Sequence, residues 1–286
     1  FPDMVVLDAE VSNSTFSERV KKIEPGQFIE TFIQEQNMVG MALGLSVKGH
    51  NVFCSTFAAF LTRCHDQIRM AALSSANLTI SGSHAGVSIG EDGASQMGLE
   101  DIALFRTLPN SIVLYPSDPI ACEKMVFDAG SEKGIKYIRT TRGKTPILYG
   151  ENEEFPLGDF KVLRESKSDS VVLAGAGITL HECLKAYEVL HAGDVNAAVV
   201  DLYCIKPFNG KKFADFAKKH GQKVVVAEDH FAEGGIGEMI AASLLGSSVE
   251  VKRFAVEGIP HSGTPEELVE KHGIGAKTIV EAAEKW

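Results

Sequence analysis

Residues 78–96 read LTISGSHAGVSIGEDGASQ, and this stretch decides the architecture. It opens with a short apolar run that predicts a buried strand. Four glycines follow, and they surround one histidine and two acids. Such a loop buries little apolar surface, yet it gathers hydrogen-bond donors around a titratable imidazole. Because sites in parallel sheets lie at the carboxyl ends of strands, His84 is a candidate site residue.

Strand-like and helix-like segments alternate on both sides of this stretch, which predicts mostly parallel sheets flanked by helices. Residues 143–158 contain two prolines and three glycines around an acidic run, as a linker does. We therefore predict two α/β domains, residues 1–150 and 158–286. The predicted strands are 5–7, 28–33, 51–55, 78–81, 111–115, 135–140, 171–174, 197–202, 224–227 and 249–256. The predicted helices are 37–47, 57–73, 96–106, 120–130, 180–190, 210–220, 236–245, 266–272 and 278–285.

Composition narrows the classes of partner. The 286 residues are 44% hydrophobic and 23% charged, as in soluble globular proteins. The formal net charge is −10, and affinity for phosphate backbones rests on lysine and arginine, so nucleic acid is not an expected partner. No apolar run has the length of a membrane span, so no membrane is expected either. The five cysteines are widely spaced and odd in number, which predicts free thiols and a cytoplasmic location.

Glu35 stands between a predicted strand and an apolar helix. A carboxylate there suits the positive end of the helix dipole, which is the simpler interpretation. The functional interpretation is a carboxylate buried at a strand end, where it meets a basic ring nitrogen. Structural carboxylates are common, so this residue alone does not decide between the two.

Phe57, Phe60 and Arg63 are spaced three residues apart within a predicted helix, and they share roughly one face. Aromatic residues at helical spacing usually belong to the core. A slot for a flat ring is the alternative, and the arginine on the same face favours an open pocket.

Two arginines, Arg139 and Arg142, stand at the carboxyl end of a predicted strand. They could clamp a phosphate or a carboxylate, or they could simply be exposed.

Two glycine motifs do not indicate a binding site. The dinucleotide pattern that begins at Gly175 and Gly177 fails because position 180 is Leu. The glycines of 234–237 are interpreted as packing residues.

Several motifs occur in an order that resembles the transketolase family, particularly its animal-type members. In the first half they are NSTFSE at 13–18, EQNM at 35–38, STFAAF at 55–60, GSH at 82–84 and GEDGASQ at 90–96. In the second half they are GAGIT at 175–179, IKP at 205–207 and VAEDH at 226–230. The resemblance spans nearly the whole chain. It implies a thiamine-diphosphate pyrimidine-binding fold followed by the Rossmann-like transketolase C-terminal fold.

The resemblance implies thiamine diphosphate as cofactor and assigns residues to it. Glu35 would be catalytic, because it would hydrogen-bond the aminopyrimidine ring and favour its imino tautomer. Phe57 and Phe60 would wall that ring, with Arg63 beside them. Glu10 would contact the cofactor where many family members have Asp, since the sequence reads Ala9-Glu10 in place of Gly-Asp.

The resemblance also assigns substrate contacts. His84 would be catalytic and would contact, with Gln96, the sugar hydroxyls and the reacting oxygen. Asp92 would bind a substrate hydroxyl. Arg142 would hold the terminal phosphate of the sugar, and Ser14 would lie near that phosphate.

The implied activity is transfer of a two-carbon ketol unit from a ketose phosphate to an aldose phosphate in the non-oxidative pentose phosphate pathway. The family's diphosphate-binding domain, with its Mg²⁺ or Ca²⁺ ligands, is not in this sequence. We therefore expect no metal ligands here, a pyrimidine domain truncated at its N-terminus, and an enzyme fragment that is inactive alone. The expected partners are sugar phosphates and the diphosphate-binding domain of the same or a second subunit in a homodimer.

Two alternatives remain at this point. The beta subunit of a 2-oxo acid dehydrogenase shares this domain order and naturally lacks the diphosphate-binding domain, although the STFAAF and GEDGASQ stretches match transketolase more closely. A non-catalytic dimerisation or regulatory module is the other alternative, supported by the departure at Ala9-Glu10.

Overall fold

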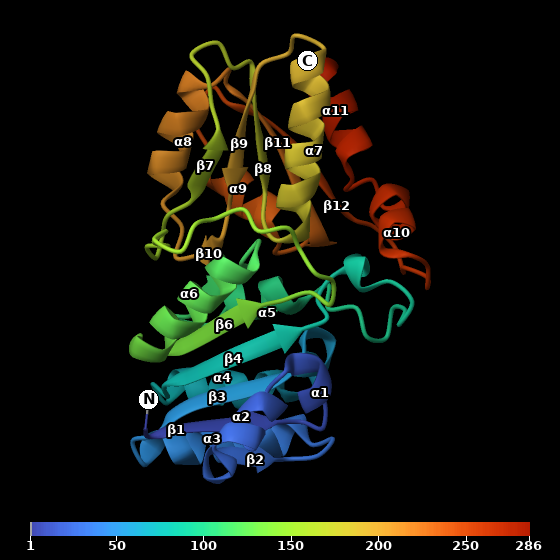
Figure 1. Ribbon diagram of the computed structural model, residues 1–286. Helices are drawn as coiled ribbons and strands as arrows, with labels where there is room; N and C mark the ends of the chain where they lie inside the picture. Colours follow the sequence, from blue (N-terminus) through green and yellow to red (C-terminus); the bar gives the residue numbers. More distant parts are fainter. Residues whose placement is uncertain (1) are drawn as a thin grey trace.

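The computed structural model describes residues 2–286 and contains two β-sheets, which lie one above the other in Figure 1. The lower sheet comes mainly from the first half of the chain and has the strand order β10-β5-β6-β4-β3-β1-β2. The upper sheet comes from the second half and has the order β12-β11-β8-β9-β7. Among the described residues, no helix is both long and apolar enough to span a membrane.

The lower sheet is parallel except for one edge strand. Its strands are β1 (Met4–Asp8), β2 (Phe28–Glu30), β3 (Asn51–Phe57), β4 (Leu78–Ser83), β5 (Ile112–Leu114), β6 (Ile135–Arg139) and β10 (Cys204–Lys206). Its α-helices are α1 (Ser12–Thr15), α2 (Glu18–Ile23), α3 (Glu35–Val47), α4 (His65–Leu73), α5 (Asp101–Arg106) and α6 (Pro119–Ser131). Three 3₁₀ helices complete this half: η1 (Pro25–Gln27), η2 (Ala58–Cys64) and η3 (Val87–Ile89).

The upper sheet is parallel except for β7, which pairs antiparallel with β9. Its strands are β7 (Lys161–Arg164), β8 (Val171–Gly175), β9 (Ala197–Asp201), β11 (Lys223–Phe231) and β12 (Glu250–Val256). Its helices are α7 (Ile178–Ala192), α8 (Gly210–Lys219), α9 (Ile236–Ser243), α10 (Pro265–Lys271) and α11 (Ala276–Glu284). The predicted class, two mostly parallel sheets flanked by helices, is confirmed.

Two strands were not predicted, and both are antiparallel. β7 and β10 are only four and three residues long, too short for a periodic pattern to be recognised. β10 belongs to the second half of the sequence but pairs with β5 at the edge of the lower sheet. This strand therefore ties the two halves of the chain together.

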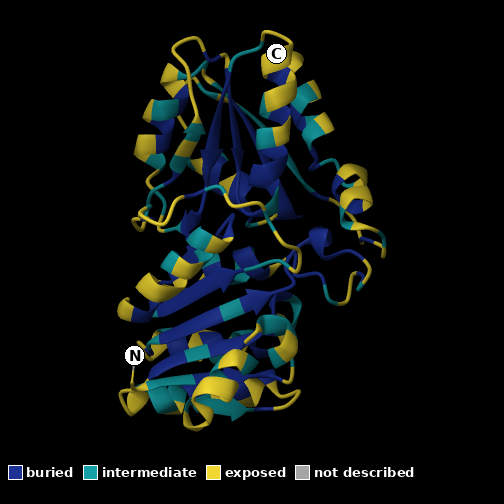
Figure 2. Cartoon of the chain, in the orientation of Figure 1, coloured by how far each residue is buried: buried dark blue, intermediate teal, exposed yellow. Residues whose placement is uncertain are grey.

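Burial explains why the strands form where they do. The central strands are buried along their lengths, whereas the helices expose their outer faces, as Figure 2 shows. Parallel strands covered on both faces are expected to be continuously apolar, and β8 fits that rule, as does β9 up to its last residue, Asp201. One apolar cluster includes Tyr115 and Tyr137 from the first half together with Ala176 and Leu202 from the second, so the two sheets share a core.

Two predicted helices need correction. The helix predicted from Phe57 starts only after it, because Phe57 ends β3 and the next turns are the 3₁₀ helix η2. The helix predicted from Gln96 starts at Asp101. The intervening backbone bonds to the glycine-rich loop instead, since Gly86 N donates to Gly98 O at 2.8 Å. Hydrogen bonds made across the loop are not available to a helix.

A buried carboxylate lies where the two halves meet. The Asp201 carboxylate accepts hydrogen bonds from Ser117 Oγ at 2.9 Å and from Tyr149 Oη at 2.6 Å. Gly177 N donates to the same Ser117 hydroxyl at 2.8 Å. Burial raises the pKa of Asp201 to about 7, from an ordinary value of 3.8. Between pH 3.8 and pH 7, the Asp201 carboxyl therefore holds a proton more often in the folded chain than in the unfolded chain. The contribution of this group to the free energy of unfolding is lost as the pH rises through 7.

We expect Asp201→Asn to flatten this part of the pH dependence of stability. The amide keeps an acceptor and the shape of the side chain but cannot ionise. Between pH 5 and pH 8 the free energy of unfolding should fall by roughly 1–3 kcal/mol less in the variant than in the unaltered chain, at about 1.4 kcal/mol per pKa unit. Urea denaturation at the two pH values measures this difference. Identical pH dependence in both proteins would contradict it.

Candidate functional site

The carboxyl edge of the lower sheet gathers most of the predicted site residues. Phe57 is the last residue of β3, and His84 directly follows β4. Glu35 begins α3, five residues after β2, and Arg142 lies three residues after β6. Ser14 lies in α1, the short helix after β1. Neighbouring parallel strands place their carboxyl ends on one side, so residues far apart in sequence share one edge.

The Glu35 side chain is buried and only half satisfied. It is 1% exposed, and its Oε2 accepts from Arg63 Nη1 at 2.5 Å. Its Oε1 has no hydrogen-bond partner, and no other buried carboxylate oxygen of residues 2–286 is left in that state. An unsatisfied buried acceptor costs about 1–3 kcal/mol, more when it is charged. The arrangement therefore favours a donor from outside the chain.

Three flat side chains stack beside this carboxylate. The rings of Phe57 and His84 lie 3.9 Å apart and are tilted by only 10°. Phe60 stacks on Phe57 at 5.2 Å, and the Arg63 guanidinium lies 5.8 Å from the Phe60 ring. Phe60 and Arg63 share one face even though they are not α-helical, because residues three apart eclipse in a 3₁₀ helix. Phe57, the last residue of β3, joins them by stacking on Phe60. Flat aromatic surfaces of this kind suit a planar ring.

His84 is held in a demanding conformation. Its φ of 56° lies in the left-handed region, which a non-glycine residue adopts only where its surroundings require it. Ser83 Oγ lies 2.9 Å from its Nδ1. Burial lowers the pKa of His84 below 6.5, while Asp92 acts to raise it and Arg142 acts to lower it further. The imidazole is therefore neutral at neutral pH and can both donate and accept a proton.

Arg142, in the segment after β6, lies against the glycine-rich loop, where its contacts are long. Its Nη1 is 3.4 Å from carboxylate oxygens of Glu91 and Asp92, and 3.4 Å from the carbonyl of Ile89. The side chain is 46% exposed, so solvent weakens these ion pairs. A phosphate could replace them with shorter, charge-assisted bonds. Gln96, at the far end of the same loop, is half-buried.

Arg139 does not form a clamp with Arg142. It is fully buried, and its Nε donates to Asp101 Oδ2 at 2.7 Å. Its Nη2 donates to the carbonyls of Gly98 and Asp229 at 3.0 and 2.8 Å. Burial acts to raise the pKa of Asp101, but the charge of Arg139 brings it below its ordinary value. Only Arg142 of this pair can reach a ligand.

One buried carboxylate near the site, Asp8, was not predicted from the sequence. Asp8 ends β1 and accepts from Thr15 Oγ1 at 2.6 Å, from Ser17 Oγ at 2.8 Å and from Val11 N at 2.7 Å. Burial raises the pKa of Asp8, although these hydrogen bonds act against that shift. The signal was an acid at a strand end followed by several hydroxyl residues. By organising this turn, Asp8 fixes the position of Ser14.

Glu10 is exposed and lies two residues after the end of β1. Its φ is 61°, and its backbone N donates to Glu30 Oε1 at 3.0 Å.

Among residues 2–286, no group of three or more histidine, cysteine, aspartate or glutamate residues could hold a metal ion.

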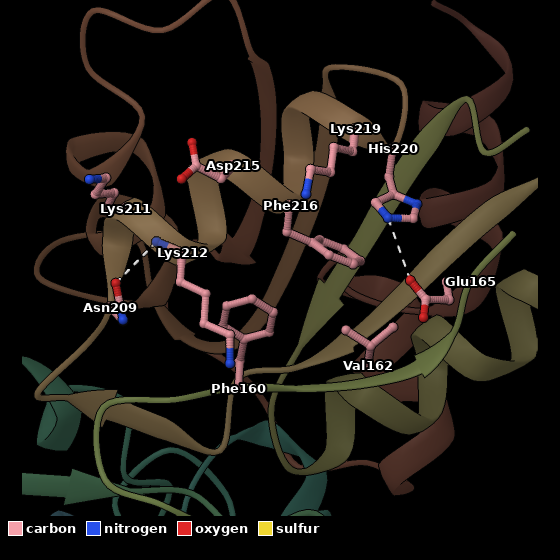
Figure 3. A pocket seen from close by; sticks show the side chains of 10 residues that line it. All are labelled: Phe160, Val162, Glu165, Asn209, Lys211, Lys212, Asp215, Phe216, Lys219 and His220. Atoms are coloured by element: carbon pink, nitrogen blue, oxygen red, sulfur yellow. Dashed lines mark hydrogen bonds and ion pairs between the residues drawn. The ribbon is translucent and has the colours of Figure 1, made fainter. Parts of the chain in front are cut away.

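A separate hollow lies in the upper half of the molecule. Figure 3 shows this open pocket of about 590 Å³ between β7 and α8. Some of its charges are paired within the chain: Lys212 bonds Asp159 at 2.6 Å, and His220 lies 2.7 Å from Asp169 and 3.5 Å from Glu165. The pocket shares no residue with the candidate site.

Comparison with known proteins identifies the family of this chain. Residues 1–147 match the family described as “Transketolase, pyrimidine binding domain”, and residues 158–279 match “Transketolase, C-terminal domain”. The chain belongs to the transketolase family. Its resemblance to that family, first seen in scattered motifs, is thereby confirmed.

Individual relatives agree. Transketolase of Mus musculus is 50% identical over 98% of this chain, and transketolase-like protein 1 of Bos taurus is 48% identical over 99%. The chain spans 45% and 48% of the lengths of those proteins. A solved structure described as “Split gene transketolase, inactive beta4 tetramer” is 34% identical, with a TM-score of 0.88 over 99% of this chain and 91% of that one. Campylobacter jejuni transketolase, at 20% identity and a TM-score of 0.83, shares the fold.

The charges around His84 give a test of the site's geometry. We expect an NMR titration to place the pKa of the His84 ring below 6.5, and Arg142→Ala to raise it, because a cation that disfavours imidazolium is removed. Arg164→Ala is the matched control, since that guanidinium lies over the Tyr187 ring in the upper half. An unchanged or lower pKa in Arg142→Ala would show that the two side chains are not neighbours in solution.

Proposed function

We propose that this chain supplies the pyrimidine-side half of a transketolase active site. The reaction is transfer of a two-carbon ketol unit from a ketose phosphate to an aldose phosphate. The observation that carries the proposal is the buried Glu35 carboxylate with one unpartnered oxygen, next to the stack of Phe57, Phe60 and His84. Membership of the transketolase family supports the same conclusion.

Thiamine diphosphate fits these residues. Its aminopyrimidine ring is planar and carries hydrogen-bonding nitrogens, which matches an aromatic stack beside an acceptor that lacks a donor. Glu35 would bond a ring nitrogen, and Phe57 and Phe60 would pack against the ring. When bound, this cofactor supplies a carbanion-stabilising centre for cleavage and formation of carbon–carbon bonds.

The chain's own residues then have distinct tasks. Arg63 holds Glu35 Oε2, so Oε1 stays directed to the ligand and can hold a proton at the ring nitrogen. His84 is neutral because burial lowers its pKa, so it can exchange a proton with a sugar oxygen. Proton transfer by a fixed side chain contributes about 10²–10⁴ to a rate.

The substrate's other end would meet the exposed rim of the site. Arg142 is the available guanidinium for a sugar phosphate, with Ser14 near the same group. Asp92 and Gln96 would bind hydroxyls along the sugar. The long contacts of Arg142 support this assignment, because they can be exchanged for a phosphate without loss of strong bonds.

Further partners follow from the proposal. Residues 1–150 act as the pyrimidine-binding domain and residues 158–286 as the C-terminal domain, within a homodimer. A diphosphate-binding domain, of the same or a partner subunit, supplies the metal ligands for Mg²⁺ or Ca²⁺. The chain alone is then inactive, and the similar split-gene tetramer is itself described as inactive. The proposed setting is the pentose phosphate pathway in the cytoplasm, which fits five cysteines without disulfides among the described residues.

We expect Glu35→Gln to lose at least ~100-fold in rate in the assembled enzyme, because an amide replaces the carboxylate that holds the ring proton. The assay is cleavage of xylulose 5-phosphate by this chain together with a transketolase diphosphate-binding domain, thiamine diphosphate and magnesium. Calorimetry gives a second readout, and the affinity for thiamine diphosphate that it measures should be weaker in Glu35→Gln.

Glu165→Gln is the matched control, since this glutamate is exposed and lies in the upper half. It should retain full activity. Full activity of Glu35→Gln would remove the carboxylate from the mechanism. Activity with a 2-oxo acid and none with the ketose phosphate would replace transketolase with a dehydrogenase beta subunit.

A further inference from the structure

The strand β11 reaches out of the upper sheet and touches the glycine-rich loop of the lower one. Near its end, the buried Asp229 accepts from Val87 N at 2.7 Å through Oδ1 and from Ser88 N at 3.2 Å through Oδ2. These two amides are consecutive, so one carboxylate fixes both the position and the direction of the loop backbone. In sequence the partners are more than 140 residues apart.

The loop is shaped to receive this carboxylate. Gly86 has a φ of 84°, and a Cβ atom built on it would lie 2.0 Å from Asp229 Oδ2. Any larger residue would displace either the loop or the carboxylate. Glycine at this position is therefore required twice, by the backbone conformation and by the close approach of the acid.

Asp229 is itself held rigidly by the lower half. Its carbonyl accepts from Arg139 Nη2 at 2.8 Å. The next two residues also bond across the junction: Phe231 N donates to Leu99 O at 3.0 Å, and Ala103 N donates to His230 Nε2 at 3.4 Å. The carboxylate can therefore hold the loop backbone in one position.

Apolar packing also holds the loop, but it does not set its register. Val87 and Ile89 share a buried cluster with Leu268 and Ile274 of the upper half, and in Figure 1 the loop after β4 lies beside α10. The hydrophobic effect is non-directional, so such a cluster tolerates small shifts along the surface. Two hydrogen bonds to one carboxylate do not tolerate them.

We propose that Asp229 is a positioning residue, through which the C-terminal half sets the geometry of the active site. The inference rests on the proposed function for its catalytic consequence. His84 lies three residues before the first anchored amide, and Asp92 lies four residues after the second. Ser88 Oγ is 3.1 Å from Thr141 Oγ1, next to Arg142. A loop that slips from Asp229 displaces the imidazole and the phosphate-binding rim together.

The first test uses Asp229→Asn in the chain by itself, with no cofactor or partner. The amide has one acceptor oxygen, so only one of the two backbone amides stays bonded. Hydrogen–deuterium exchange should accelerate roughly tenfold or more at whichever of the Val87 and Ser88 amides loses its acceptor, as expected for loss of a charge-assisted hydrogen bond. The α3 segment, residues 35–47, should exchange as before.

Asp194→Asn is the matched control, because this exposed aspartate sits in a left-handed turn that asparagine also accepts. Gly86→Ala is a second variant, which disturbs the same contact from the loop side. Unchanged exchange at Val87 and Ser88 in both variants would overturn the inference. Faster exchange spread evenly over the chain would overturn it too, because it would show general destabilisation.

The second test uses the assembled enzyme. Asp229→Asn should raise KM for xylulose 5-phosphate and lower kcat, whereas calorimetric binding of thiamine diphosphate should stay unchanged, since Glu35 and Phe57 are on other elements. Weakened cofactor binding would contradict a role limited to the loop. If the unaltered enzyme proves inactive, the proposed function fails, while the exchange experiment still decides whether Asp229 fixes the loop.

Discussion

A fully buried arginine is the constraint on which the junction of the two halves depends. Arg139 ends β6 with no exposed surface, and a guanidinium in that position is tolerable only when it is paired and hydrogen-bonded. Asp101 neutralises it, and the carbonyls of Gly98 and Asp229 accept from it. Its guanidinium carbon lies 4.5 Å from the centre of the Tyr115 ring. One side chain thereby fixes α5, the end of the glycine-rich loop and the end of β11 relative to one another.

Buried acids at the carboxyl ends of the upper strands complete that junction. Asp201 ends β9 and bonds Ser117 and Tyr149, while Asp229, near the end of β11, bonds the loop of the lower half. Glu228, beside it, accepts from the first amides of α9, and burial raises its pKa to about 7. In open parallel sheets this edge usually receives a ligand. Here the acids of the upper sheet are satisfied by the chain itself, so the ligand edge is left to the lower sheet.

The sequence was sufficient for the parts that depend on local pattern. Alternating strands and helices predicted two mostly parallel sheets, and the strand-end rule singled out His84 as a site residue. Phe57 was predicted inside a helix, and its place at the end of β3 was not foreseen. The sequence was not sufficient where the decisive partner is distant. Nothing near Arg139 announces Asp101, 38 residues away, or Asp229, 90 residues away, so that arginine was interpreted as a possible clamp. The strand β10 was missed for a related reason, because three residues form a strand only when β5 is already there to pair with them.

The contrast among the buried carboxylates separates structure from function in this chain. Asp8, Asp101 and Asp229 each accept several hydrogen bonds from nearby groups, as a folded chain requires of buried charge. Glu35 is as deeply buried but keeps one oxygen without a donor among the described residues. Among residues 2–286, every other buried carboxylate oxygen has a hydrogen-bond partner, so Glu35 Oε1 is an exception. The unpaired oxygen of Glu35 is best explained by a donor that arrives with a ligand, and the aromatic stack beside it indicates that this ligand is flat.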